Sequence, residues 1–141
     1  MRQEPEILCY NFSGLSLGVS QHFLKETIKQ VFSFLQKQEK QVISSLSLIF
    51  IKPQEIKRLN HLWRHRNQVT TVLTFEEGDI FFCPQEIKKR AKIQKIPLKL
   101  YYQQLVIHSL LHLFGYTHEV AKKRKVMEHL EQQIIASLNK K

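Results

Sequence analysis

The chain has 141 residues and a formal net charge of +10, from 22 Lys and Arg against 12 Asp and Glu. A chain of this length is expected to form a single domain over residues 1–141. No apolar run reaches the roughly 18 residues of a transmembrane helix, and the first residues lack the shape of a signal peptide. Cys9 and Cys83 make no disulfide framework, so we expect a cytoplasmic protein with two small core thiols and no membrane partner.

Strands and helices are predicted to alternate in the first half of the chain. Residues 7–12 form a short apolar strand, and Ser20 is placed to cap a helix that extends to about residue 38. Residues 45–51 form a second strand. A helix over residues 53–63 follows, with a proline in its first turn, where a missing N–H costs nothing.

A hairpin and three helices are predicted for the second half. The hairpin strands are residues 69–75 and 79–82, joined by a tight turn that contains Gly78. The three helices are a basic one over residues 84–95, an apolar one over 101–114 and an amphipathic one after residue 118. The order βαβαββααα predicts an α+β fold, in which helices cover a small mixed four-stranded sheet.

The apolar helix carries a histidine motif. His108 and His112 are four residues apart, so their imidazoles lie on one helix face, about 6 Å apart along the axis. Gly115 is expected to end the helix in a left-handed conformation, after which the chain can return His118 to the same point. Three imidazoles leave the fourth position of a tetrahedral ion to water, as in catalytic zinc sites. We therefore predict one Zn²⁺ per chain, held by His108, His112 and His118, and no other cofactor.

The segment His-Ser-Leu-Leu-His-Leu-Phe-Gly-Tyr-Thr-His, residues 108–118, resembles the signature H-G-x-L-H-L-x-G-Y-D-H of the YbeY family of metal-dependent endoribonucleases, the rRNA maturation factors. Ser109 and Thr117 depart from that signature. Further segments also resemble the family: Leu59–Arg64, Thr70–Phe75 with Thr71 in place of aspartate, Gly78–Ile80, and Met127 with Glu131. The resemblance covers about residues 45–138.

The resemblance implies a zinc-dependent endoribonuclease for single-stranded RNA, which acts in 3′-end maturation of small-subunit rRNA and in ribosome quality control. Its partners would be rRNA and the small ribosomal subunit or its assembly factors, and the oligomeric state stays open. The resemblance makes Arg64 the active-site arginine, so Arg64 and His112 are the predicted catalytic residues. A guanidinium suits this role because it binds phosphate bidentately, although the sequence alone allows an ordinary surface arginine.

Two alternative functions stay open. Metzincin peptidases share the histidine spacing, but they need a glutamate as general base at the position of Ser109. A non-catalytic RNA-binding ribosome-assembly factor would use zinc structurally, and an open fourth ligand position argues against that.

Charged residues near the motif suggest further contacts. Basic residues at 88–99 and 122–125 bracket the histidines in sequence and predict a surface for phosphates. Asp79 is considered as a partner that orients a ligating histidine, with capping and sheet-edge roles equally open.

Overall fold

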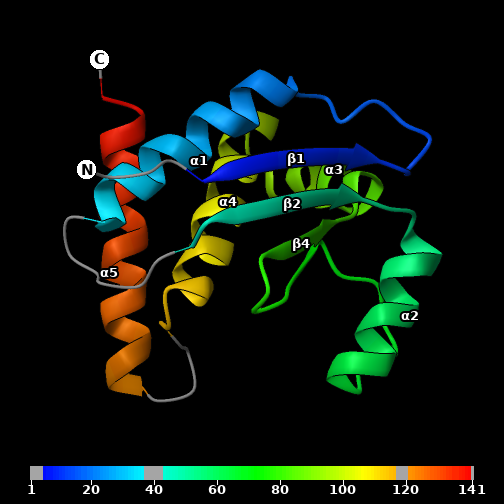
Figure 1. Ribbon diagram of the computed structural model, residues 1–141. Coiled ribbons are helices and arrows are strands. Elements are labelled where there is room, and N and C mark those ends of the chain that lie inside the picture. The colour runs from blue at the N-terminus through cyan, green and yellow to red at the C-terminus, as the bar shows by residue number, and fades with distance from the viewer. Residues whose placement is uncertain (1–4, 37–42, 117–120, 141) are drawn as a thin grey trace.

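A computed structural model describes residues 5–36, 43–116 and 121–140 of the chain (Figure 1). The described residues form four strands and five helices in the predicted order. These are β1 (Glu6–Asn11), α1 (Gln21–Gln36), β2 (Ser45–Phe50), α2 (Pro53–Arg64), β3 (Val72–Thr74), β4 (Asp79–Phe82), α3 (Pro84–Gln94), α4 (Leu98–Leu113) and α5 (Ala121–Leu138). The predicted α+β class is confirmed. No helix among the described residues has the length and apolar character needed to cross a membrane.

The sheet is mixed and has the strand order β1-β2-β4-β3. β1 and β4 both run parallel to β2, whereas β3 is antiparallel to β4, so the predicted hairpin is confirmed. β3 is shorter than the predicted strand over residues 69–75, because only Val72–Thr74 pair with the four-residue β4. The preceding carbonyl of Thr71 accepts a hydrogen bond from the amide of Cys83 at 2.9 Å.

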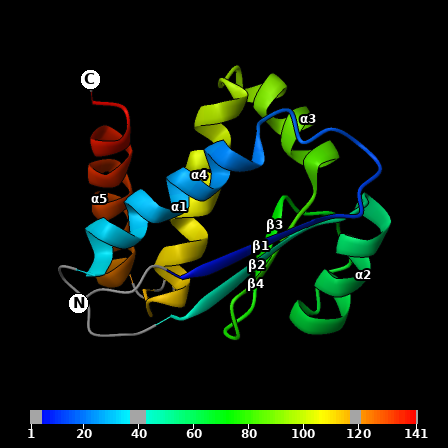
Figure 2. The same ribbon diagram turned by 45° about the horizontal axis from the view of Figure 1, so that its top comes forward.

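Helices cover both faces of the sheet, as Figure 2 shows, with α2 on one side and α1, α4 and α5 on the other. Alternate residues of β2, namely Leu46, Leu48 and Phe50, are buried in the larger core beneath α1 and α4. On the opposite face a smaller cluster, which includes Ile56 of α2 and Leu73 of β3, packs under α2. One face of the sheet therefore packs against α4, which carries the histidine motif, and the other face packs against α2.

Helix starts follow the local signals in the sequence. The hydroxyl of Ser20 accepts a hydrogen bond from the amide of Phe23 at 3.0 Å, which confirms the predicted cap of α1. Pro53 and Pro84 occupy the first turns of α2 and α3. α4 begins at Leu98, directly after Pro97 and three residues earlier than predicted, and it packs against α1, α3, α5 and β3.

The two cysteines are not joined in a disulfide. Cys83 is buried and Cys9 is half-buried, and both pack against core residues as the sequence predicted. Burial raises the pKa of each thiol above its ordinary value, so neither is favoured as a thiolate nucleophile at neutral pH.

Candidate active site

The end of α4 is shaped by a Schellman motif that follows His112. The amide of Gly115 donates to the carbonyl of His112, and the amide of Tyr116 donates to that of Leu111, both at 3.0 Å. Gly115 has a φ of 94°, a conformation that costs little only for glycine, so the predicted helix end is confirmed. The motif turns the chain away from the helix axis directly after the histidine pair. His118, the third predicted ligand, lies outside the described residues.

His108 and His112 bring their Nε2 atoms to 3.1 Å from each other. Two nitrogen ligands at about 2.0–2.1 Å from one tetrahedral zinc ion are separated by about 3.3 Å, so this spacing fits two ligands of one metal ion. It also suits a hydrogen bond between the rings, depending on the tautomers. Among the described residues no third histidine, cysteine or carboxylate completes a metal-binding group.

A carboxylate lies behind the histidine pair. Oε1 of Glu131, on α5, is buried and lies 3.5 Å from Nδ1 of His108. A carboxylate on the second ring nitrogen favours a proton there, which leaves the lone pair of Nε2 for a metal. The sequence suggested Asp79 for such a role, but Asp79 begins β4 and lies opposite Ser47 in the sheet.

Glu131 belongs to one of the segments that resemble the family, but the sequence predicted no role for it. The pattern of apolar residues in α5 nevertheless indicates where Glu131 lies. The buried stripe of this helix consists of Met127, Leu130 and Ile134. Glu131 is four residues after Met127 and next to Leu130, so helical periodicity places a carboxylate at the edge of the face that packs on α4.

Arg64 lies in the same cleft as the histidines. It is the last residue of α2, and its Nη2 atom donates to the carbonyl of Thr74 in β3 at 2.9 Å. Its guanidinium carbon lies 5.1 Å from the ring centroid of Phe75. The cleft has a volume of about 480 Å³, and Arg64, Thr74, His108 and His112 line it together with Glu76 of the β3–β4 turn. The structure thus brings together Arg64, His108 and His112.

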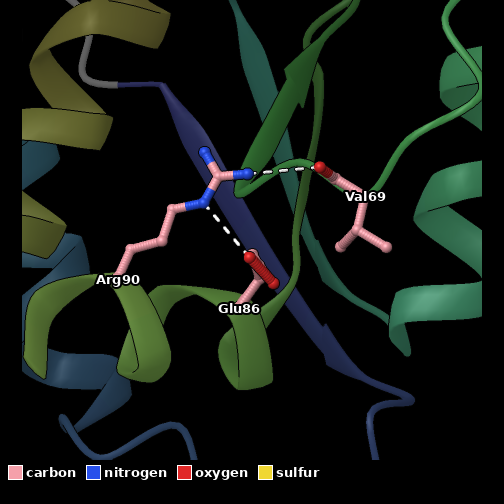
Figure 3. A network of polar contacts seen from close by, with 3 residues as sticks. All are labelled: Val69, Glu86 and Arg90. Carbon is pink, nitrogen blue, oxygen red and sulfur yellow. Dashed lines mark hydrogen bonds and ion pairs between the residues drawn. The ribbon is translucent and has the colours of Figure 1, made fainter. Parts of the chain in front are cut away.

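The connection from α2 to β3 is held at two points, which fixes Arg64 relative to Thr74. The buried side chain of Asn60 donates to the carbonyl of Gln68 at 3.0 Å. Figure 3 shows the second point, where Arg90 of α3 donates to the carbonyl of Val69 and to the carboxylate of Glu86, each at 3.2 Å. The first bond ties the loop to α2 and the second ties it to α3, so both helices hold the connection between Arg64 and Thr74.

Ser109 faces the core and is not part of the cleft lining. Its side chain is fully buried, and within the described part of the chain its hydroxyl makes no hydrogen bond. The Ser109 side chain therefore does not reach the space between His108, His112 and Arg64. The carboxylate that lines the cleft, Glu76, comes from the hairpin turn instead of the histidine helix.

Lys88 of α3 lies far from the histidine pair. Lys88 donates to the carbonyl of Ser16, and it lies with Leu98, the first residue of α4, beside Gly18. His112 is 14 residues further along that helix, about 21 Å along its axis. Arg124 and Lys125, by contrast, are exposed near the start of α5, the helix that follows the histidine motif.

The chain is similar to known proteins in both sequence and fold. Residues 14–139 match the model of a family described as Endoribonuclease YbeY, so the similarity begins earlier than residue 45. An Endoribonuclease YbeY of Buchnera aphidicola subsp. Baizongia pistaciae is 34% identical over 102 residues, which cover 64% of this chain and 66% of that protein. One of Ruthia magnifica subsp. Calyptogena magnifica is 30% identical over 132 residues, which cover 86% and 88%.

A solved structure also resembles the chain. The solution structure of TM1509 from Thermotoga maritima is similar to it with a TM-score of 0.65 and 26% sequence identity. The similarity covers 92% of this chain and 87% of that protein. The mixed sheet and its helices are therefore an arrangement that a solved structure shares.

Proposed function

Because the chain belongs to the Endoribonuclease YbeY family, we propose that it is a zinc-dependent endoribonuclease that cleaves single-stranded RNA. Its substrate would be the precursor of small-subunit rRNA in the cytoplasm, near its 3′ end, with the small subunit or its assembly factors as partners. The observation that carries this proposal is the convergence of Arg64 with His108 and His112 on one cleft.

The residues that would hold zinc are His108, His112 and His118. The first two fit the ion, because their Nε2 atoms are 3.1 Å apart and a carboxylate lies behind His108. Bound zinc would supply a Lewis acid that polarises a phosphoryl oxygen and makes water more acidic. Glu131 would hold the His108 ring in the orientation that such an ion needs.

Arg64 would bind the phosphodiester. The bond from its Nη2 atom to the Thr74 carbonyl fixes the guanidinium in the cleft wall, and its remaining N–H groups can face a phosphate. A fixed cation at this point stabilises negative charge as it develops on the phosphoryl oxygens, without any reorganisation of the side chain.

A zinc peptidase is less well supported. The position at which such enzymes carry their glutamate base is occupied by Ser109, whose side chain is buried in the core. A serine hydroxyl is not a general base at neutral pH, so the histidine helix lacks the carboxylate that a zinc peptidase needs at this position. The chain charge of +10 also suits a polyanionic substrate better than an ordinary peptide.

One preparation of the zinc-loaded full chain tests the reaction class. It is offered a single-stranded RNA with the 3′ end of precursor small-subunit rRNA, the same sequence as a duplex, and casein. We expect cleavage of the single strand alone, with loss of activity on chelation and in His112→Ala. Casein cleavage that disappears in His112→Ala, with the RNA intact, would support the peptidase. Tight RNA binding with no cleavage at any zinc concentration would support the assembly factor.

A further inference from the structure

The last turn of α2 presents two large apolar side chains to solvent, directly before Arg64. Leu62 is 62% exposed and Trp63 is 58% exposed. Trp63 is the only tryptophan in the chain. Exposure of so large a ring costs free energy, so its position beside the cleft calls for a physical reason.

The indole of Trp63 is held in place although more than half of it is open. It stands edge-on to Phe75, with ring centroids 6.1 Å apart and planes at 82°. Phe75 in turn stands edge-on to Phe81 of β4, at 5.6 Å and 86°. The indole is therefore the outer end of a row of three rings that is rooted in the sheet.

The same Phe75 ring also lies against Arg64. The guanidinium carbon is 5.1 Å from its centroid, and the indole is 6.1 Å from it. The Phe75 ring therefore contacts both Arg64, the proposed phosphate contact, and the exposed indole of Trp63. That arrangement suits a nucleotide, which carries a flat base next to a charged phosphate.

The charge around Trp63 favours a nucleic acid over a protein partner. No acidic residue occurs between Glu55 and Glu76, and this stretch contains Lys57, Arg58, Arg64 and Arg66. These four basic side chains are all exposed on α2 or the residues that follow it. An aromatic platform among basic side chains is typical of surfaces that bind single-stranded nucleic acids, because every base has a π-face to stack and every nucleotide a phosphate to pair.

We propose that Trp63 stacks on an unpaired nucleobase next to the phosphodiester that Arg64 contacts. This inference rests on the proposed function, and it gives single-strand preference a physical cause. A base within a duplex is already stacked and paired, so it cannot turn onto the indole without the cost of opening the helix.

Because Trp63 is the sole tryptophan, its fluorescence reports stacking directly. The zinc-loaded full chain is mixed in a stopped-flow instrument with a ten-nucleotide single-stranded RNA, and the signal is recorded before cleavage begins. We expect quenching by the single strand and none by the duplex. An abasic nucleotide at one position relative to the cleavage site should abolish the quenching, whereas abasic sites further away should not.

Steady-state kinetics of RNA cleavage give a second readout. Trp63→Ala should raise KM roughly tenfold with a smaller change in kcat, since stacking contributes about 1–3 kcal/mol per base. Trp63→Phe should recover most of the loss, and Leu62→Ala, which removes an equally exposed neighbour, should leave KM unchanged. If Trp63→Ala does not fold, the fluorescence of the wild type and the abasic series still decide the question.

The outcomes separate this inference from the proposed function. RNA cleavage with no change in fluorescence, and with the same KM for every abasic substrate and in Trp63→Ala, would overturn the stacking role and leave the nuclease intact. Absence of both RNA cleavage and RNA binding would overturn the two together.

Discussion

The Nδ1 atom of His108 lies 3.5 Å from the Oε1 atom of Glu131, so a carboxylate of α5 stands behind the first histidine of α4. Glu131→Gln keeps the shape of the side chain and removes its charge. We expect zinc affinity to fall about 10- to 100-fold, because the imidazole loses the partner that orients it. Competition with a chromophoric chelator measures the change. Glu128→Gln, an exposed site on the same helix, is the matched control, and equal effects of the two variants would argue against the role of Glu131.

Arg64→Ala should lower kcat/KM for RNA roughly 100-fold, the size of effect seen when one fixed donor to a developing charge is removed. Zinc content should not change, since Arg64 is not a predicted ligand. Arg64→Lys should recover little, because a single ammonium group cannot hold the Thr74 carbonyl and a phosphate with the same planar geometry. Arg66→Ala removes an exposed arginine two residues away that does not line the cleft, so it should lower kcat/KM far less than Arg64→Ala does. Wild-type kinetics in Arg64→Ala would remove this residue from the site.

Ser109→Ala should stabilise the protein. The hydroxyl is fully buried and makes no hydrogen bond to any described residue, so its removal relieves a desolvation cost of about 1 kcal/mol or more. Alanine also has the higher helix propensity, and Ser33→Ala on the exposed face of α1 measures that smaller contribution alone. Urea denaturation of the three proteins gives the comparison. If Ser109→Ala increases the free energy of unfolding no more than Ser33→Ala does, the Ser109 hydroxyl has a hydrogen-bond partner in solution.

Gly78→Ala should destabilise the fold more than Gly115→Ala. Both glycines have positive φ, 104° and 94°, so alanine at either position is strained by roughly 1–2 kcal/mol. At Gly78 the new Cβ would also lie 2.6 Å from the backbone carbonyl oxygen of Ser45, whereas at Gly115 it meets nothing described within 4 Å. Thermal denaturation should therefore show the lower melting temperature for Gly78→Ala, and the reverse order would contradict the tight hairpin turn.

Tyr102→Phe should change how stability depends on pH in the alkaline range. The phenol is buried and donates to the Leu17 carbonyl at 2.9 Å, and burial raises its pKa well above the ordinary value. Above pH of about 10 the unfolded chain loses this proton while the folded chain keeps it, so wild-type stability falls as pH rises. At pH 8 the free energy of unfolding of Tyr102→Phe should be about 1 kcal/mol lower than that of the wild type. The variant should not show the part of the alkaline decrease in stability that Tyr102 causes. Urea denaturation at pH 8 and pH 10.8 tests whether the difference in free energy of unfolding between the wild type and Tyr102→Phe is smaller at the higher pH.

Features that depend on one or two helical turns could be predicted from the sequence alone. Ser20 caps α1 and Gly115 ends α4 because hydrogen bonds within a turn and the conformational freedom of glycine act locally. His108 and His112 share a face because the helical repeat requires it. The order of strands and helices followed from the same short-range patterns, and resemblance to known proteins singled out Arg64.

Contacts between residues that are distant in sequence could not be predicted and depend on how the elements pack. The approach of Arg64 to the histidines depends on the pairing of β3 with β4 and on the bond from Arg64 to Thr74, ten residues along the chain. The contact of His108 with Glu131 depends on how α5 packs on α4. Burial of Ser109 likewise depends on neighbours of α4 that are remote in sequence. Such contacts form because packing of apolar surfaces repays the entropy of closing long loops, and no local pattern in the sequence encodes that balance.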